Sequence, residues 1–415
     1  MRLSQILYKQ HIGRQTRLMW YLQGKRTPVE TLTEKTLAAK GIQVLDPEDV
    51  LKKPHGKPKF DFTSLNLLEK RPPTRDKNHP DWHDRPCLTY KDNDLLTLGL
   101  PQAQDITKTV VFENQLPEAV ESLIEDIPEE YHNLAQKTIK TSVIFDAHQE
   151  LLPKVKDPNR PAFNFPRLMG ITDVRKISNL SKKLIQLCEC INGPEVSETR
   201  SMLDNVLLSF PFEREFDLHQ FVLTMDMMLM CEKPLTPSGH FNEEVINSME
   251  IPNLHPLHCS IGLDEENIYK LNNFHPLVSG YHKSHIHTII AYYDPSKVKH
   301  KSELSSTESQ TLGRALLKAF TAAASSARQR FGLDVKELPE PITVQCIHSD
   351  GKWFYFSVYQ LNTLDIEGKN GIKNYYWMLP KLDLYKVGGY VRGTPVLEGY
   401  NPEVLKTMLA FYRNN

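Results

Sequence analysis

The chain has 415 residues, of which 40% are hydrophobic and 24% charged, and its formal net charge is −1. These proportions are close to the averages for soluble globular domains, and they exclude collagen-like, transmembrane and wholly disordered proteins. The longest apolar stretch, residues 221–231, is interrupted by Asp226 and is too short for a bilayer, which takes roughly 20 residues to span. Six cysteines are spread along the chain. Because a small disulfide-stapled domain has a much denser pattern, we expect reduced thiols.

The N-terminal segment, residues 1–29, is basic throughout. It contains six lysines and arginines and no acidic residue, and the first carboxylate belongs to Glu30. Leu3, Ile6 and Leu7 can gather on one side of a helix with the bases around the rest, which is the pattern of a mitochondrial transit peptide. A basic arm that stays on the protein and touches RNA is the alternative. Without these six charges the net charge falls from −1 to −7, so we expect any RNA contact to be confined to patches.

Residues 30–89 are expected to form an extended arm rich in proline and basic residues. Between residues 52 and 86, nine bases stand against five acids, and no apolar period persists long enough for a buried helix. A solvated linker is the alternative. The folded body then spans residues 90–415. The arm residues that we consider for nucleic-acid binding are Lys52, Lys53, Lys57 and Lys59.

Several segments of the folded body have the periodicity of a helix or a strand. A helical pattern, restarted at Pro128, covers residues 114–149. Further helices are predicted at 180–191, where Asn192-Gly193-Pro194 stops the pattern, and at 402–412. Short apolar runs predict strands at 202–210, 216–224 and 285–293.

The clearest predicted element is a helix over residues 306–331. Thr307 offers an N-terminal cap, Gly332 ends the helix, and apolar residues such as Leu312 and Leu316 recur at helical spacing. The opposite face is predicted to bind phosphate because its bases have no acid between them, and a merely solvated face is the alternative. These bases are Arg314, Lys318, Arg328 and Arg330.

A β-hairpin is predicted next. Ser349-Asp350-Gly351 lies between two alternating apolar runs, 342–348 and 352–361, and Asp-Gly in that position is a strong hairpin signal. Phe354, Phe356 and Val358 should face one side of the sheet, and Trp353, Tyr355 and Tyr359 the other, so both faces need cover from helices or from a partner. The predicted fold class is therefore α+β: a mixed sheet with a C-terminal β-hairpin packed by helices, preceded by an extended N-terminal arm.

No motif for catalysis or cofactor binding is recognisable. The chain has 16 histidines, several of them between His255 and His287, but no C-x-x-C or H-E-x-x-H pattern defines a metal site. Cys188 and Cys190 would point in nearly opposite directions from a helix, so we expect a core cysteine beside an exposed one. Walker, G-x-G-x-x-G and G-x-S-x-G motifs are absent. We therefore expect a protein that is not an enzyme and has no cofactor. A metal-dependent matrix enzyme that uses the His255 to His287 region is the alternative.

From about residue 79 to the end, short stretches resemble a known family in the same order. They include Leu184-Ile185-Gln186-Leu187-Cys188, Asn267-Ile268-Tyr269, Gln360-Leu361-Asn362-Thr363-x-Asp365 and Gly371-Ile372-Lys373-Asn374. The chain resembles the family of mitochondrial large ribosomal subunit protein thirty-seven, which is related to the mitoribosomal death-associated protein family. The resemblance implies a structural constituent of the mitochondrial large ribosomal subunit that supports translation in the matrix.

The resemblance also implies the partners. They would be other mitochondrial ribosomal proteins, including a related paralogue, and the large-subunit rRNA, with no membrane. A free mitochondrial RNA-binding adaptor is a further alternative.

Overall fold

The computed structural model describes residues 32–45, 76–157, 159–238, 249–277, 280–298 and 306–415. The chain divides into two units, Met1–Pro72 and Pro73–Asn415. In the first unit the described residues contain the helix α2 (Leu32–Ala39), which buries none of its residues. The predicted transit peptide, residues 1–29, lies outside the described residues, and so do the arm residues Lys52, Lys53, Lys57 and Lys59.

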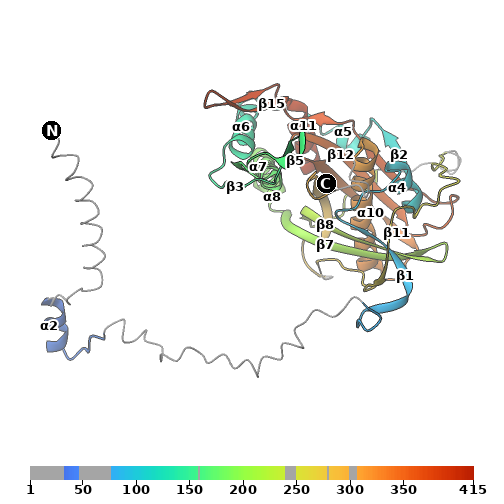
Figure 1. Cartoon of the computed structure of the whole chain (residues 1–415), viewed down its shortest axis with the longest axis horizontal. Helices are drawn as coiled ribbons and strands as arrows, with labels where there is room; N and C mark the ends of the chain where they lie inside the picture. Colours follow the sequence, from blue (N-terminus) through green and yellow to red (C-terminus); the bar gives the residue numbers. More distant parts are fainter. Residues whose placement is uncertain (1–31, 46–75, 158, 239–248, 278–279, 299–305) are drawn as a thin grey trace. The chain divides into compact units, whose positions relative to one another are not determined.

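The second unit holds the helices and strands of the folded body (Figure 1). Its helices are α4 (Leu100–Thr107), α5 (Glu118–Glu121), α6 (Glu129–Ile139), the π-helix η1 (Lys140–Ile144), α7 (Asp173–Asn192), α8 (Pro194–Ser197), α10 (Glu308–Phe331) and α11 (Pro402–Arg413). The strands of the main sheet are β1 (Trp82–Lys91), β2 (Thr109–Glu113), β7 (Arg200–Arg214), β8 (Asp217–Cys231), β9 (Asp264–Ile268), β10 (His285–Tyr292), β11 (Glu337–Ser349), β12 (Trp353–Thr363), β13 (Asn374–Met378) and β14 (Leu382–Asp383). Among the described residues, three small two-stranded sheets pair β3 (Glu150–Leu151) with β6 (Met169–Gly170), β4 (Lys156–Asp157) with β5 (Arg160–Asn164), and β15 (Val387–Val391) with β16 (Thr394–Glu398).

The main sheet is mixed, as predicted. Its order is β2-β13-β12-β11-β10-β8-β1-β9, with β7 beside β8 and β14 beside β12. The long strand β8 organises one half of it. One edge of β8 pairs antiparallel with β7 along its whole length, and the other edge is shared by β1, which is parallel, and β10, which is antiparallel. The parallel pairs β10 with β11 and β13 with β2 complete the mixed pattern.

Helices cover both faces of this sheet. On one face α10 and α4 pack against a core that includes Tyr355 and Tyr359 of β12. On the other face α7 and α11 pack against a core that includes Phe354, Phe356 and Val358. The alternation predicted for the second hairpin strand is therefore confirmed, and both aromatic faces are covered by helices of the same chain.

The start of α10 follows from a capping box. The Thr307 hydroxyl accepts a hydrogen bond from the backbone N–H of Gln310 at 3.3 Å, and the Gln310 side-chain oxygen accepts from the N–H of Thr307 at 3.0 Å. These two bonds satisfy donors that a helix end leaves free. Further along, a Cβ added to Gly313 would lie 2.7 Å from the backbone carbon of Gly99. Only glycine allows α10 to cross the start of α4 so closely.

The folded body begins earlier than the sequence indicated. β1 spans Trp82–Lys91 and pairs with both β8 and β9, so the boundary predicted at residue 90 falls inside a strand. The first half of β1 is largely exposed, and burial begins only at Cys87. The first half therefore shows no alternating apolar pattern in the sequence. α7 also starts earlier than predicted, at Asp173. Among the helices that the structure describes, none combines the length and apolar character needed to cross a bilayer.

Candidate nucleic-acid interface

α10 carries the four bases that were predicted to form an exposed, phosphate-binding face. Arg314 and Lys318 lie one turn apart on the same side of the helix, but their side chains are only 2% and 0% exposed. Arg328 is partly buried, and Arg330 is exposed. The expectation of an exposed face is therefore wrong for Arg314 and Lys318. The middle of α10 is surrounded by the sheet and by α4, and its alanine-rich sequence allows close packing on all sides.

The Lys318 ammonium lies between two carboxylates. Its Nζ is 2.7 Å from Oδ1 of Asp92 and 3.6 Å from Oδ2 of Asp226. It also donates a hydrogen bond to the carbonyl oxygen of Thr224 at 2.7 Å. Burial opposes the ionisation of Asp92, but Lys318 and Arg314 outweigh that effect and hold the pKa of Asp92 below its ordinary value. Lys318 is thus the buried counter-charge of two partly exposed carboxylates.

The Arg314 guanidinium is also fully engaged inside the protein. It donates to the carbonyl oxygen of Asp92 at 3.1 Å, to that of Tyr292 at 3.2 Å and to Nε2 of His348 at 3.0 Å. An imidazole nitrogen that accepts a hydrogen bond must be unprotonated. Burial, reinforced by the charges of Arg314 and Lys318, keeps the pKa of His348 well below its ordinary value. Arg314 therefore has no donor directed at an external phosphate.

We name these five side chains, Asp92, Asp226, Arg314, Lys318 and His348, the charge cluster. They come from the segment after β1, from β8, from α10 and from β11. Asp92 and Asp226 were not identified from the sequence as partners of the bases on α10. One signal was present, since Asp226 interrupts the longest apolar run of the chain. A charge in such a run must find a partner when the run is buried.

The remaining two bases of α10 behave differently from each other. The Arg328 guanidinium lies 4.1 Å from the ring centroid of Phe210 and donates to the carbonyl oxygen of Pro211. Arg330 lines a hollow of about 320 Å³ with His275, among other residues. Within the described part of the chain, Arg330 forms no ion pair with a carboxylate. Of the four predicted bases, Arg330 is the one whose charge remains accessible.

The histidines considered for a metal site are dispersed in the structure. No group of three histidine, cysteine, aspartate or glutamate side chains could hold a metal ion among the residues described. His258 pairs with Glu215 at 3.1 Å, and His282 pairs with Glu232 at 2.9 Å. His287 is fully buried, and its Nε2 donates to the carbonyl oxygen of Asn414 at 2.8 Å.

The prediction made from the spacing of Cys188 and Cys190 is confirmed. Cys188 is buried and Cys190 is exposed, as predicted from their spacing on α7. All six cysteines are free thiols in the structure.

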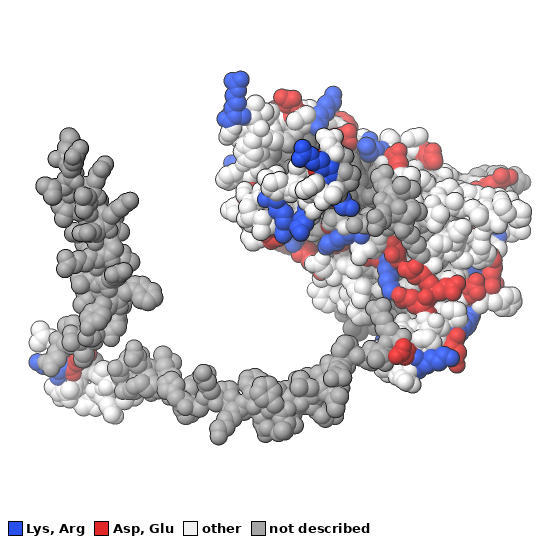
Figure 2. Space-filling model, in the orientation of Figure 1, with Lys and Arg blue, Asp and Glu red and all other residues white. Residues whose placement is uncertain are grey.

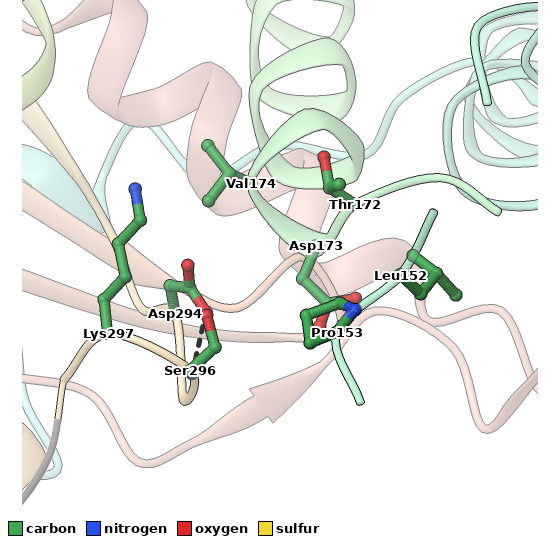
Figure 3. A pocket seen from close by; sticks show the side chains of 8 residues that line it. All are labelled: Leu152, Pro153, Thr172, Asp173, Val174, Asp294, Ser296 and Lys297. Atoms are coloured by element: carbon green, nitrogen blue, oxygen red, sulfur yellow. Dashed lines mark hydrogen bonds between the residues drawn. The ribbon is translucent and has the colours of Figure 1, made fainter. Parts of the chain in front are cut away.

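A second hollow, of about 280 Å³, lies at the N-terminal end of α7 (Figure 3). Oδ1 of Asp294 accepts hydrogen bonds from the backbone N–H and the hydroxyl of Ser296, at 2.8 and 2.6 Å. Asp173 pairs with Lys176 at 2.9 Å. Nucleophilic catalysis needs a nucleophile held by a base that is itself oriented by a third group. The eight residues that line this hollow do not form such an arrangement: they are Leu152, Pro153, Thr172, Asp173, Val174, Asp294, Ser296 and Lys297.

Comparison with known proteins agrees with the family resemblance. Residues 257–415 match the family model described as mitochondrial 28S ribosomal protein S30 (PDCD9). The chain is 29% identical over 345 residues to large ribosomal subunit protein mL37 of Rattus norvegicus, covering 80% of this chain and 76% of that protein. It is 28% identical over 352 residues to mL37 of Bos taurus, with 81% and 77% covered, and 28% identical over 357 residues to mL37 of Gallus gallus, with 82% and 77% covered. The resemblance seen in the sequence is confirmed: over about four fifths of its length this chain is similar to large ribosomal subunit protein mL37.

Proposed function

We propose that this protein is a structural constituent of the mitochondrial large ribosomal subunit and that it supports translation in the mitochondrial matrix. The observation that carries the proposal is the similarity to mL37 of mammals and chicken, which extends over four fifths of the chain. The match of the C-terminal region to a mitochondrial ribosomal protein family supports the same compartment.

The buried charges favour an architectural role over an enzymatic one. In an active site, ionisable groups with shifted pKa values line a cleft and face a substrate. Here the buried Arg314 and Lys318 are both directed at Asp92, whose side chain is only partly exposed. His348, which accepts from Arg314, is 0% exposed. These contacts tie α10 to the sheet, so the charge cluster contributes to the fold.

We further propose that contacts with rRNA are local. Arg330 is exposed and forms no ion pair with a described carboxylate, so it can meet a phosphate. The arm lysines, Lys52, Lys53, Lys57 and Lys59, are the other candidates from the sequence. The remaining surface, which carries the acidic excess of the chain, suits protein neighbours better than phosphate. A related paralogue is one such neighbour that the family resemblance implies.

Gradient sedimentation of a mitochondrial lysate tests the proposal. The tagged full-length chain should sediment with the large-subunit rRNA, and the same tag on an unrelated matrix protein serves as the control. Recovery wholly in the light soluble fractions, with stoichiometric zinc after purification, would instead support the metal-dependent enzyme. Sedimentation with other RNA, shifted to light fractions by nuclease, would support the free adaptor.

A further inference from the structure

The long hairpin of β7 and β8 ends in a tight turn of unusual sequence. Arg214 pairs with Asp217, so Glu215 and Phe216 alone form the turn. Their φ angles are 51° and 68°. Two-residue hairpin turns often require this left-handed conformation at both positions, and asparagine and glycine normally occupy them because other side chains clash there. A glutamate followed by a phenylalanine is therefore a strained choice.

Phe216 is also exposed to an extent that folding alone does not explain. Its exposed fraction is 96%, the highest of any large apolar residue in the described ranges. Single apolar residues on a surface are common. At Phe216, however, an exposed aromatic ring coincides with a strained backbone, and strain of this kind concentrates where a residue has a function.

The turn is held in place by neighbouring segments. Arg85 of β1 donates from Nη2 to the carbonyl oxygen of Phe216 at 2.6 Å and from Nη1 to Oε1 of Glu213 at 2.7 Å. His258 pairs with Glu215 at 3.1 Å. The ring is thus presented from a braced hairpin, which reduces the conformational entropy that a partner would have to remove on binding.

The charges around Phe216 indicate what kind of partner fits. Glu213, Glu215 and Asp217 are exposed on the hairpin itself, and acidic side chains gather on the side of the body where β7, β8 and β1 lie (Figure 2). The bases beside the turn pair with two of these carboxylates: Arg85 with Glu213, and both Arg214 and His258 with Glu215. Asp217 forms no ion pair with a described base. An acidic rim repels the phosphates of RNA and attracts lysine and arginine.

We propose that Phe216 anchors this protein to a neighbouring protein, by inserting into an apolar pocket whose rim carries lysine and arginine. The inference rests on the proposed function, because the neighbour would be another protein of the large subunit. A buried aromatic anchor with a polar rim is the usual composition of a binding hot spot. The strain at the turn would be retained because it fixes the direction of the ring.

The proposal can be tested with Phe216→Gly, a change that should affect folding and assembly in opposite directions. Glycine relieves the left-handed strain, so the Tm of the purified full-length chain should rise or stay unchanged. When variant and wild type are expressed together, the variant should be depleted about tenfold in isolated large subunits, as expected for loss of a hot-spot residue. Phe216→Tyr should restore incorporation. Leu333→Gly, at a residue that is 65% exposed, is the matched control and should incorporate normally.

Two results would overturn this inference. Incorporation of Phe216→Gly at the wild-type ratio would show that the ring anchors nothing. Increased incorporation of Asp217→Lys would show that the partner is RNA, whereas a protein pocket with a basic rim should exclude that variant. In both cases the wild-type chain would still sediment with the large subunit. Its absence from that fraction would instead reject the proposed function.

Discussion

Replacing Lys318 by methionine should destabilise the folded body. Methionine keeps most of the apolar stem and removes the ammonium group, which lies 2.7 Å from Asp92 and 3.6 Å from Asp226. Lys318 is 0% exposed, so both carboxylates would lose their buried counter-charge, a change that typically costs about 3–5 kcal/mol. The side chains of Asp92 and Asp226 are 31% and 22% exposed, and Arg314 remains beside Asp92. We therefore expect a loss of about 3 kcal/mol, at the lower end of that range.

Chemical denaturation of the purified full-length chain at pH 7, followed by circular dichroism, measures this loss. Arg330→Met is the matched control on the same helix, and because Arg330 is exposed its substitution should change the free energy of unfolding by less than about 0.5 kcal/mol. Combining Lys318→Met with Asp92→Asn should recover part of the loss, since one unpaired carboxylate is then neutral. A Lys318→Met variant as stable as the wild type would refute the assignment of a buried, charged Lys318.

Incorporation and acid stability provide two further predictions. Arg330→Glu should weaken incorporation into the large subunit, and the defect should depend on the salt concentration because a contact with phosphate does. Lys137→Glu on α6 is the control. Normal incorporation of Arg330→Glu at elevated salt would show that Arg330 is merely solvated. Burial lowers the pKa of His219 to about 4, that of His287 to about 3 and that of His348 well below its ordinary value. Between pH 6.5 and the lowered pKa of each histidine, the unfolded chain binds a proton that the folded chain does not. As the pH is lowered through this range, the free energy of unfolding should therefore decrease by up to about 1.4 kcal/mol per pH unit for each histidine. Thermal melts should show the Tm falling from pH 7 to pH 5, and a constant Tm would contradict the burial of these neutral imidazoles.

The elements that could be predicted are those whose signal is local. The helix expected at 306–331 is α10, Glu308–Phe331, because its cap, its period and its terminating glycine all lie within one segment. The hairpin is equally local: Ser349 pairs with Phe354 across the predicted turn. β1 could not be delimited in this way, since its exposed first half becomes a strand only by pairing with β8 and β9.

The candidate site was harder to predict than the fold. A helical wheel of α10 places Arg314, Lys318 and Arg328 on the side away from the apolar stripe, whereas Arg330, 18 residues after Leu312, lies on the same side as Leu312. It does not show that the segment after β1 supplies Asp92 to cover that side. Arg330 escapes this burial because it lies in the last turn, where the helix emerges at the surface.

Short-range periodicity and residues in a fixed order were enough to predict the main helices, the hairpin, the mixed α+β class and the resemblance to a ribosomal protein family. Which charges are free depends instead on how distant parts of the chain pack together. Arg314 and Lys318 are buried against Asp92, Asp226 and His348, residues far from α10 along the chain. The burial of a charge depends on partners that only the folded chain brings within a few ångströms.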